Sequence, residues 1–483
     1  MRKRSKKKAN KIFKSIFSIL LGGTFLWLLF QMWNIKLLAN KTILIIIGIV
    51  ALIVILLIVG LIKSKSKVSK GILYTLSTIF IVIFSVGIYY MSSTLSFLNV
   101  FGNTKTKYDY YYVMVLKNSK YEEIEDLQNK NIGLYLDNKR EVLDKISIKF
   151  NDEVYDDANE LLTDFFDKKI DAILISDANE CIIEEIDEDF ASKVKIIKRI
   201  SLKKKNEVEV SNKNITKETF ILYISGIDTY GKIGNVSRSD VNIIATINPN
   251  KHEILLTSIP RDFYVKLHKT KNNPNALKDK LTHAGIYGVN ESITTIEDLL
   301  DIDIDHYIKV NFDTVVKLVD QLGGITIYSD KSLKLDECYY RHGNNNVNGK
   351  CALRFARERH SYATGDRHRG ENQEEVIKAI INKVQSSTAI LTNYNNILAN
   401  LKNNMETSLT PKNMKDLIGL QMGDMPTWDV KTVNLDGKGG WEVTYSGGST
   451  HLSVMIPDQE TVDKAHSLIS GMLKGKSFDR LGI

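Results

Sequence analysis

The sequence predicts an α/β protein with a three-layer α-β-α domain, preceded by a three-helix transmembrane anchor and a small α/β accessory domain. Two observations lead to this fold class. Three apolar runs succeed one another before residue 92, and beyond them short β-branched runs alternate with segments of helical spacing. A chain of 483 residues has room for two or three such domains.

The three apolar runs predict membrane spans at 12–33, 42–62 and 71–91. Each is long enough to cross a hydrocarbon core of about 30 Å, because a helix rises about 1.5 Å per residue. Two further spans follow the first, which argues against a cleaved signal peptide. Residues 1–91 are therefore expected to anchor the chain in the plasma membrane.

Basic residues orient this anchor. The first eleven residues hold seven Lys and Arg and the 63–70 loop holds four lysines, whereas the 34–41 loop holds two. Basic loops remain in the cytoplasm, so the N-terminus is expected inside and everything after Met91 outside. Residues 1–91 hold 14 basic and no acidic residues, which leaves a net charge of −6 on the remainder. That remainder gives no electrostatic support to nucleic-acid binding.

Residues 105–205 predict the accessory domain, and the charged stretch 206–214 predicts a linker. Apolar runs at 111–116 and 131–135 are typical of strands, and 158–166 has helical spacing. We find no catalytic set of residues here. Two interpretations stay open: a spacer or accessory domain, and a module that binds a ligand or partner.

Residues 215–483 predict the main domain, which begins with three buried strands at 220–224, 241–247 and 254–259. Helical spacing at 291–300 and 313–322 alternates with strand-like runs at 306–312 and 325–329, as in a three-layer α/β domain. The ends of the first three strands carry charges of both signs, at Asp228, Arg238, Asp240, Arg261 and Asp262. A divalent cation with a phosphate-bearing ligand would need both signs. Structural ion pairs are the alternative.

A second charged cluster lies further along the chain, at Arg354, Arg357, Arg359, Arg367 and Arg369. Several converging guanidiniums suit a pyrophosphate, because each binds phosphate oxygens through two parallel hydrogen bonds. The interrupted pattern favours a loop that places its arginines, followed by a helix after Asn372 with Gln373 in its first turn. A solvated basic helix start is the alternative.

Other motifs narrow the function. The sequence contains no GxSxG, HExxH or GxxxxGK[ST] motif, which argues against a serine hydrolase, a zincin and a P-loop enzyme. The three cysteines form no CxxC pair, so a zinc site is not expected. Cys338 and Cys351 flank a polar stretch and could form a disulfide if the region is exported, but three cysteines do not describe a disulfide scaffold, so the pairing stays open.

The order and spacing of these blocks resemble the LytR–CpsA–Psr (LCP) family. The resemblance rests on GID, SRSD, INP, SIPRD, KLTHA, DIDIDHYIKVNF, LGGI and ALRFARER…GDRHRGENQ, between about 219 and 385. The three spans and the accessory domain resemble the capsule-associated CpsA branch. The resemblance implies an extracytoplasmic phosphotransferase that moves an anionic glycopolymer, capsular or like teichoic acid, from a polyprenyl-pyrophosphate carrier to peptidoglycan.

Matching motifs also imply roles for single residues. Mg²⁺ or Mn²⁺ would be held by Asp228 and Asp240. The pyrophosphate would be bound by Arg238, Arg261, Arg357, Arg359, Asp366 and Gln373. Asp240, Arg238 and Asp262 would be catalytic, and the proton of the acceptor hydroxyl would pass to Asp240 or Asp262. Capsule or wall assembly proteins are expected partners. A membrane-bound regulator or scaffold that senses lipid-linked precursors without turnover stays open as an alternative, as does hydrolysis of prenyl pyrophosphates.

Overall fold

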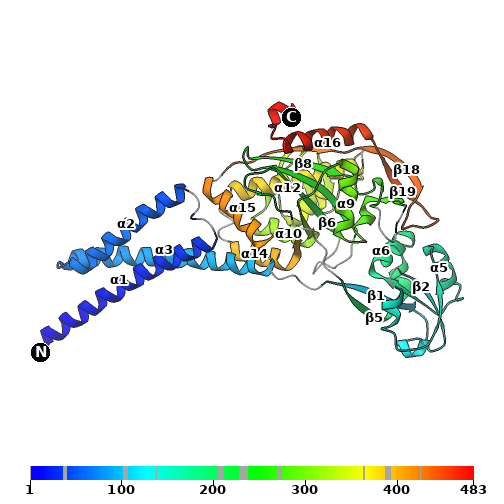
Figure 1. Ribbon diagram of the computed structural model, residues 1–483, viewed down its shortest axis with the longest axis horizontal. Helices are drawn as coiled ribbons and strands as arrows, with labels where there is room; N and C mark the ends of the chain where they lie inside the picture. Colours follow the sequence, from blue (N-terminus) through cyan, green and yellow to red (C-terminus); the bar gives the residue numbers. More distant parts are fainter. Residues whose placement is uncertain are drawn as a thin grey trace. The chain divides into compact units, whose positions relative to one another are not determined.

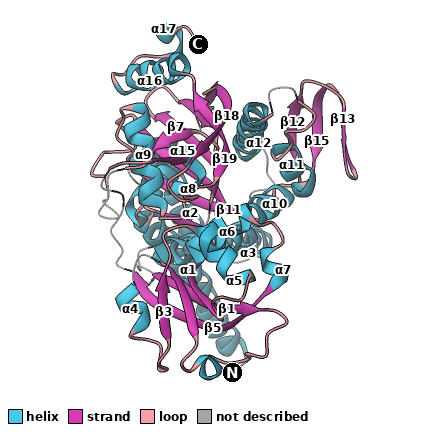
Figure 2. Cartoon of the chain, turned by 90° about the vertical axis from the view of Figure 1, so that its right-hand side faces the viewer, coloured by secondary structure: helices cyan, strands magenta, loops and turns pink. Residues whose placement is uncertain are grey.

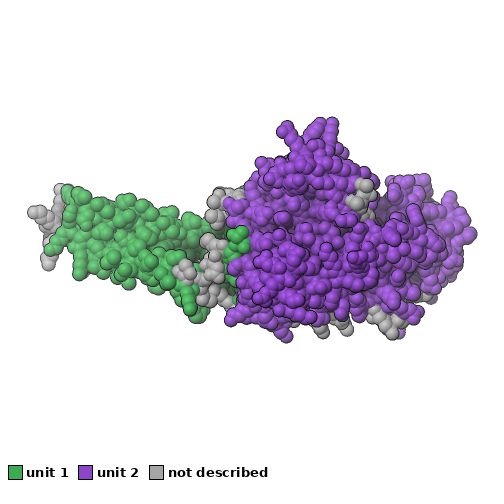
Figure 3. All heavy atoms as spheres, turned by 90° about the horizontal axis from the view of Figure 1, so that it is seen from above, with its two compact units in different colours: residues 1–103, 390–402, 409–427 green, residues 104–389, 403–408, 428–483 purple. Residues whose placement is uncertain are grey.

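The computed structural model describes residues 2–35, 38, 41–101, 107–136, 139–204, 211–227, 238–268, 273, 275–362, 365–386, 393–424 and 426–483. The chain forms two compact units (Figure 3). The first consists of residues 1–103, 390–402 and 409–427, and the second of residues 104–389, 403–408 and 428–483. Each unit is described by itself.

Three long helices form most of the first unit (Figure 1): α1 (Arg2–Asn34), α2 (Lys41–Lys63) and α3 (Lys67–Phe101). They contain the three predicted spans, and by length and composition each can cross a membrane. A small shared core includes Leu21, Val54 and Phe84, while most of the remaining apolar side chains face outward, as contact with lipid would require. The predicted helical anchor is confirmed to this extent.

Lys14 is the charge inside the first predicted span. Its ammonium donates to the carbonyl oxygens of Ile62, at 3.1 Å, and Ser64, at 2.8 Å. These carbonyls lie at the end of α2, where a helix leaves its last acceptors without intrahelical partners. The lysine ammonium therefore has two of its hydrogen bonds satisfied at a helix end within the anchor.

Two helices from the C-terminal half of the sequence also belong to the first unit: α14 (Tyr394–Asn404), except for its last residues, and α15 (Pro411–Asp424). The α15 helix packs against α3. The hydroxyls of Tyr394 and Thr94 lie 2.5 Å apart. Because α3 continues ten residues beyond Met91, where the predicted span ended, it offers this additional packing surface.

Residues 107–204 of the second unit contain their own five-stranded sheet, in the order β3-β2-β4-β1-β5 (Figure 2). Its strands are β1 (Lys107–Leu116), β2 (Asn131–Tyr135), β3 (Asn151–Val154), β4 (Ala172–Ser176) and β5 (Val194–Lys204). Its helices are α4 (Lys139–Leu143), α5 (Ala158–Phe166), α6 (Asp177–Ile186) and α7 (Phe190–Lys193), with a 3₁₀ turn at Ile124–Leu127. Apolar clusters cover both faces of the sheet. We call residues 107–204 the accessory region.

A six-stranded sheet organises the rest of the second unit, in the order β16-β11-β6-β7-β8-β17. Its strands are β6 (Phe220–Ile227), β7 (Ser239–Asn248), β8 (Glu253–Ile259), β11 (His306–Asn311), β16 (Met405–Thr407) and β17 (Asp429–Asn434). The three predicted opening strands are confirmed as β6, β7 and β8, which pair antiparallel. Parallel neighbours, β11 beside β6 and β17 beside β8, extend the sheet on each side.

Helices cover both faces of this sheet, which confirms the α-β-α layering (Figure 1). On one face, α9 (Val289–Leu300) and α16 (Gln459–Leu473) share an apolar core with alternate strand residues such as Ile221 and Tyr223. On the other, α12 (Asp366–Ser386) packs on β7, β8 and β17. The helices α10 (Phe312–Gln321) and α11 (Gly349–Ala356) precede α12 in the chain and pack on one another.

Short hairpins complete the second unit. The strand pairs are β9 (Tyr264–Lys266) with β10 (Lys278–Lys280), β12 (Ile325–Ser329) with β15 (Gly343–Val347), β13 (Leu333–Leu335) with β14 (Cys338–Tyr340), and β18 (Gly437–Val443) with β19 (His451–Pro457). Two short helices are α8 (Leu281–Ala284) and α17 (Phe478–Leu481). A disulfide, which the sequence left open, joins Cys338 to Cys351, with the Cα atoms 5.6 Å apart.

Candidate active site

Antiparallel pairing brings the predicted charged residues of β7 and β8 together. Asn242 of β7 pairs with Ile259 of β8, so the beginning of one strand lies beside the end of the other. Asp240 and Arg261, which extend from these two strand ends, meet in an ion pair with 2.6 Å between Nη1 and Oδ1. Thr282 adds a hydroxyl 3.5 Å from the same carboxylate oxygen. The expected cluster of mixed charge at the sheet edge therefore exists.

The second predicted cluster is divided between two helices and the loop that joins them, and Arg357 and Arg359 lie in this loop, as predicted. Arg354 lies in the last turn of α11 and Arg357 directly follows that helix. The α12 helix begins at Asp366, so the expected helix start after Asn372 was wrong by about two turns. Arg369 and Gln373 are four residues apart on α12 and share one face of it. The missed signal is this four-residue spacing, which the glycines at 365 and 370 obscured.

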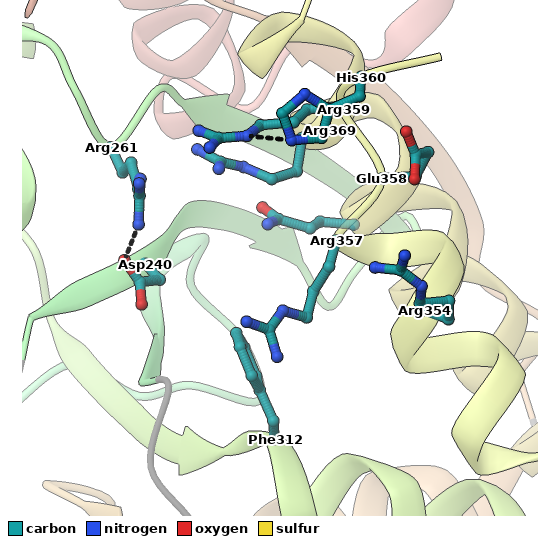
Figure 4. A pocket seen from close by; sticks show the side chains of 10 residues that line it. Asp240, Arg261, Phe312, Arg354, Arg357, Glu358, Arg359, His360 and Arg369 are labelled. Atoms are coloured by element: carbon teal, nitrogen blue, oxygen red, sulfur yellow. Dashed lines mark hydrogen bonds and ion pairs between the residues drawn. The ribbon is translucent and has the colours of Figure 1, made fainter. Parts of the chain in front are cut away.

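The two clusters line a common pocket of about 360 Å³ (Figure 4). Its lining consists of Asp240, Arg261, Phe312, Arg354, Arg357, Glu358, Arg359, His360, Arg369 and Gln373. Five guanidiniums thus face two carboxylates, which makes the pocket a site for an anion. Figure 4 shows the side chains of Arg359 and Arg369 extending side by side toward the Arg261 side of the pocket.

Contacts inside the pocket fix several of these arginines. The guanidinium of Arg357 lies 5.2 Å from the centroid of the Phe312 ring, a cation–π distance. Arg261 bonds Asp240 through Nη1 and approaches Asp262 through Nε, at 3.4 Å. Arg369 is only 9% exposed. Arginines held in this way lose less side-chain entropy when a ligand binds.

The predicted site residues divide into three groups. The structure places Asp240, Arg261, Arg357, Arg359 and Gln373 around the pocket. Arg238 and Asp262 are outside the set that lines it, although both are joined to it through charged neighbours. Asp228 and the side chain of Asp366 lie outside the described residues.

Five further residues line the pocket without having been predicted as site residues: Phe312, Arg354, Glu358, His360 and Arg369. Arg354, His360 and Arg369 lie in or beside the predicted arginine cluster. Their position close to it in the sequence could therefore have indicated them as site residues. Phe312 follows β11, which pairs with β6 on the side away from β7, and only the sheet order brings it to the pocket.

The oxygen donors of the pocket suit a hard cation in their chemistry. Mg²⁺ binds proteins through one or two carboxylates and completes its shell with waters and phosphate oxygens. Asp240 offers such a carboxylate beside arginines that would hold phosphate. Within the described part of the chain, no group of three or more His, Cys, Asp and Glu residues gathers as a metal site. One aspartate with ligand phosphates is therefore the set that fits.

A buried charge cluster lies beside the pocket and was not predicted. His283 of α8 is fully buried, with Nδ1 2.6 Å from Asp279 and Nε2 2.8 Å from Glu185. Burial lowers the pKa of His283, but the two carboxylates outweigh it and raise the pKa to about 9. Burial likewise raises the pKa of Glu185, but His283 and Lys280 outweigh it, so that this pKa falls well below its usual range. His283 is thus a charged partner in an ion cluster.

The fold and the site together define a class of protein: an α/β protein with a candidate membrane anchor and an arginine-lined pocket whose charge suits an anion. A profile of the LytR_cpsA_psr family matches residues 189–465. The chain belongs to the LytR–CpsA–Psr family.

Named relatives are similar over about half of the chain. The polyisoprenyl-teichoic acid–peptidoglycan teichoic acid transferase TagU of Enterococcus faecalis is 34% identical over 226 residues, which cover 46% of this chain and 71% of TagU. Biofilm regulatory protein A of Streptococcus mutans is 30% identical over 273 residues, 53% of this chain and 64% of that protein. The crystal structure of protein gbs0355 from Streptococcus agalactiae is 27% identical, with a TM-score of 0.46 over 55% of this chain and 92% of that one.

Proposed function

We propose that the chain is a membrane-anchored, extracytoplasmic transferase that moves an anionic glycopolymer from a polyprenyl-pyrophosphate carrier to peptidoglycan. The glycopolymer would be a capsular polysaccharide or resemble teichoic acid. The observation that carries the proposal is the pocket in which five arginines face Asp240 at a sheet edge. The membership in the LCP family and the name of the TagU relative support it.

The pocket residues suit transfer of a phosphate-linked group. A hydroxyl oxygen of peptidoglycan attacks the phosphorus that carries the glycopolymer, and the bond from this phosphorus to the prenyl phosphate breaks. Negative charge spreads over the phosphate oxygens during such a transfer. Arg357, Arg359 and Arg369 stabilise that charge, and the prenyl monophosphate leaves with the electron pair of the broken bond.

Two carboxylates are candidates for serving the acceptor hydroxyl: Asp240, which lines the pocket, and Asp262, which lies outside the lining and contacts it through Arg261. Asp240 and Asp262 bracket the guanidinium of Arg261, and one of them accepts the proton of the attacking hydroxyl. Mg²⁺ or Mn²⁺ held by Asp240, with Asp228 as its expected second ligand, would neutralise phosphate charge when bound. Arg261 keeps Asp240 oriented toward the ligand.

The location follows from the anchor and its charges. The three candidate spans and their basic loops favour a cytoplasmic N-terminus and an outer catalytic part. The Cys338–Cys351 disulfide supports an oxidising compartment for that part. Peptidoglycan and the outer ends of lipid-linked polymers are in the same compartment.

Transfer to an acceptor tests the proposal. The full chain in detergent is given lipid-linked polymer, peptidoglycan oligomers and Mg²⁺, and the covalent product is measured. We expect product with wild-type chain, none after addition of a chelator, and a loss of at least about a hundredfold with Asp240→Asn. Thr326→Val, a surface change on β12, serves as the control and is expected to transfer at the wild-type rate.

The same assay separates the alternatives. A regulator or scaffold, as the name of the Streptococcus mutans relative suggests for that protein, would bind the lipid-linked polymer and form no product. A prenyl-pyrophosphate hydrolase would release phosphate in the absence of peptidoglycan. Either result would refute the transferase.

A further inference from the structure

A glutamate of the accessory region lies among charged residues beside the pocket. Glu185, at the end of α6, contacts three basic side chains beside the pocket: Arg238, Lys280 and His283. Its Oε2 lies 2.8 Å from His283 Nε2 and 3.6 Å from Arg238 Nη1, while its Oε1 bonds the ammonium of Lys280. The Glu185 carboxylate therefore contacts three basic side chains from two different segments of the chain.

Burial makes this contact necessary. His283 and Asp279 are fully buried, and the side chain of Lys280 is 6% exposed. Charges removed from water are tolerated only when they are paired and hydrogen-bonded. Asp279 alone balances one of the two buried cations, and Glu185 supplies the second negative charge. Among the described residues, loss of the Glu185 charge would leave Lys280 with only the longer contact to Asp262, at 4.0 Å.

The cluster continues into the pocket. Lys280 Nζ lies 4.0 Å from Asp262 Oδ1, and Asp262 Oδ2 lies 3.4 Å from Nε of Arg261, which pairs with Asp240. The backbone follows the same route, because the amide of Thr282 donates to the carbonyl of Arg261 at 2.8 Å. A series of charged contacts thus leads from Glu185 to the carboxylate that lines the pocket.

A second group of contacts between the accessory region and the rest of the unit carries no such link. The amide of Ser449 donates to Asp157 Oδ2 at 2.7 Å, and the side-chain amide of Asn159 donates to the hydroxyl of Thr450. Neither contact involves a residue that lines the pocket. Docking of the accessory region and adjustment of the pocket can therefore be tested with different substitutions.

We propose that Glu185 is a positioning residue of the transferase site: it fixes Arg238 and the series Lys280–Asp262–Arg261 in the arrangement that binds the pyrophosphate. The accessory region is then a structural part of the active site rather than a spacer. The inference rests on the proposed function for the identity of the ligand. Glu185 acts through its neighbours and does not itself touch the pocket.

Binding of farnesyl pyrophosphate to the full chain in detergent micelles, measured by calorimetry with Mg²⁺, tests the inference. We expect Glu185→Gln to weaken binding about tenfold, as loss of an outer-shell partner does at other sites. Glu188→Gln removes the same charge from an exposed position three residues further along the chain. This variant is expected to bind as wild type. Thr450→Val, which removes the docking hydrogen bond to Asn159 outside the charge cluster, is expected to do the same.

A double-mutant cycle separates positioning from a general loss of structure. If Glu185 acts through Arg238, then Glu185→Gln costs less affinity in an Arg238→Ala chain than in wild type. Equal losses in both backgrounds would overturn the inference, as would wild-type affinity of Glu185→Gln. If Glu185→Gln fails to fold, Glu185→Asp replaces it in the test, because it keeps the charge on a shorter side chain. Glu185→Asp is expected to fold and to bind with intermediate affinity. Wild-type affinity of Glu185→Asp would refute positioning by Glu185.

The proposed function fails on a different measurement. A wild-type chain that binds farnesyl pyrophosphate but transfers no polymer would refute the transferase, while an effect of Glu185→Gln on binding would still support positioning. Conversely, transfer by wild type with no effect of Glu185→Gln on binding or on KM would refute positioning alone.

Discussion

Replacing His283 with glutamine should change how the stability of the second unit depends on pH. His283 is fully buried between Asp279 and Glu185, and its Nδ1 also lies 2.8 Å from the hydroxyl of Ser446. Lys280 is the other cation of this cluster. Glutamine can keep a hydrogen bond to a carboxylate but cannot carry the positive charge that the two carboxylates require.

The magnitude follows from the pKa of His283, which the two carboxylates raise from 6.5 to about 9 against the opposing effect of burial. At about 1.36 kcal/mol per unit of pKa, this difference corresponds to about 3 kcal/mol of folding free energy. Because the pKa is raised in the folded state, that contribution is fully present below pH 6.5 and is lost as the pH rises through about 9. The lowered pKa of Glu185 has the opposite sign, since its contribution is present above pH 4.5 and is lost as the pH falls.

Urea unfolding of the full chain in detergent, at several values between pH 6 and 9, measures the effect. We expect the free energy of unfolding of wild type to fall by about 3 kcal/mol more than that of His283→Gln across this range. His342→Gln, at an exposed histidine, should follow the wild-type curve. Parallel curves for wild type and His283→Gln would refute a charged histidine in the cluster.

Two further predictions concern the pocket and the anchor. Arg357→Ala and Arg359→Ala should each weaken farnesyl pyrophosphate binding by about tenfold or more in calorimetry, because each removes a charge-assisted contact. Arg341→Ala, at an exposed arginine outside the pocket, should bind as wild type. Unchanged affinity of the first two variants would exclude pyrophosphate binding by these arginines. The topology can be tested in a Cys181→Ser chain with a membrane-impermeant maleimide. The reagent should label Tyr339→Cys in intact cells, since Tyr339 is 68% exposed on the predicted outer part, and Lys65→Cys only after permeabilisation. Labelling of position 65 in intact cells would refute the predicted topology.

Local patterns in the sequence were sufficient for the helices and strands that frame the site. The apolar runs of the anchor and the β-branched runs of β6, β7 and β8 are signals of a few neighbouring residues, and the structure has a helix or strand at each. The start of α12 was misplaced because glycines at 365 and 370 weaken the helical signal, whereas packing on β7, β8 and β17 stabilises the helix there. Tertiary contacts thus outweighed local propensity at that point.

The sequence by itself determined the anchor, the alternation of strands and helices, and the chemistry of the pocket, because hydrophobic spacing and residue type are local properties. It could name Asp240, Arg261 and the arginines after 353 without showing how they meet. Only the tertiary structure decided that Phe312 and Arg369 join them, since the sheet order and the packing of α12 are long-range contacts. It also decided the position of Glu185, about 50 residues before Arg238 in the chain. There the Glu185 carboxylate contacts Arg238 and Lys280, two cations that only the folded chain brings together.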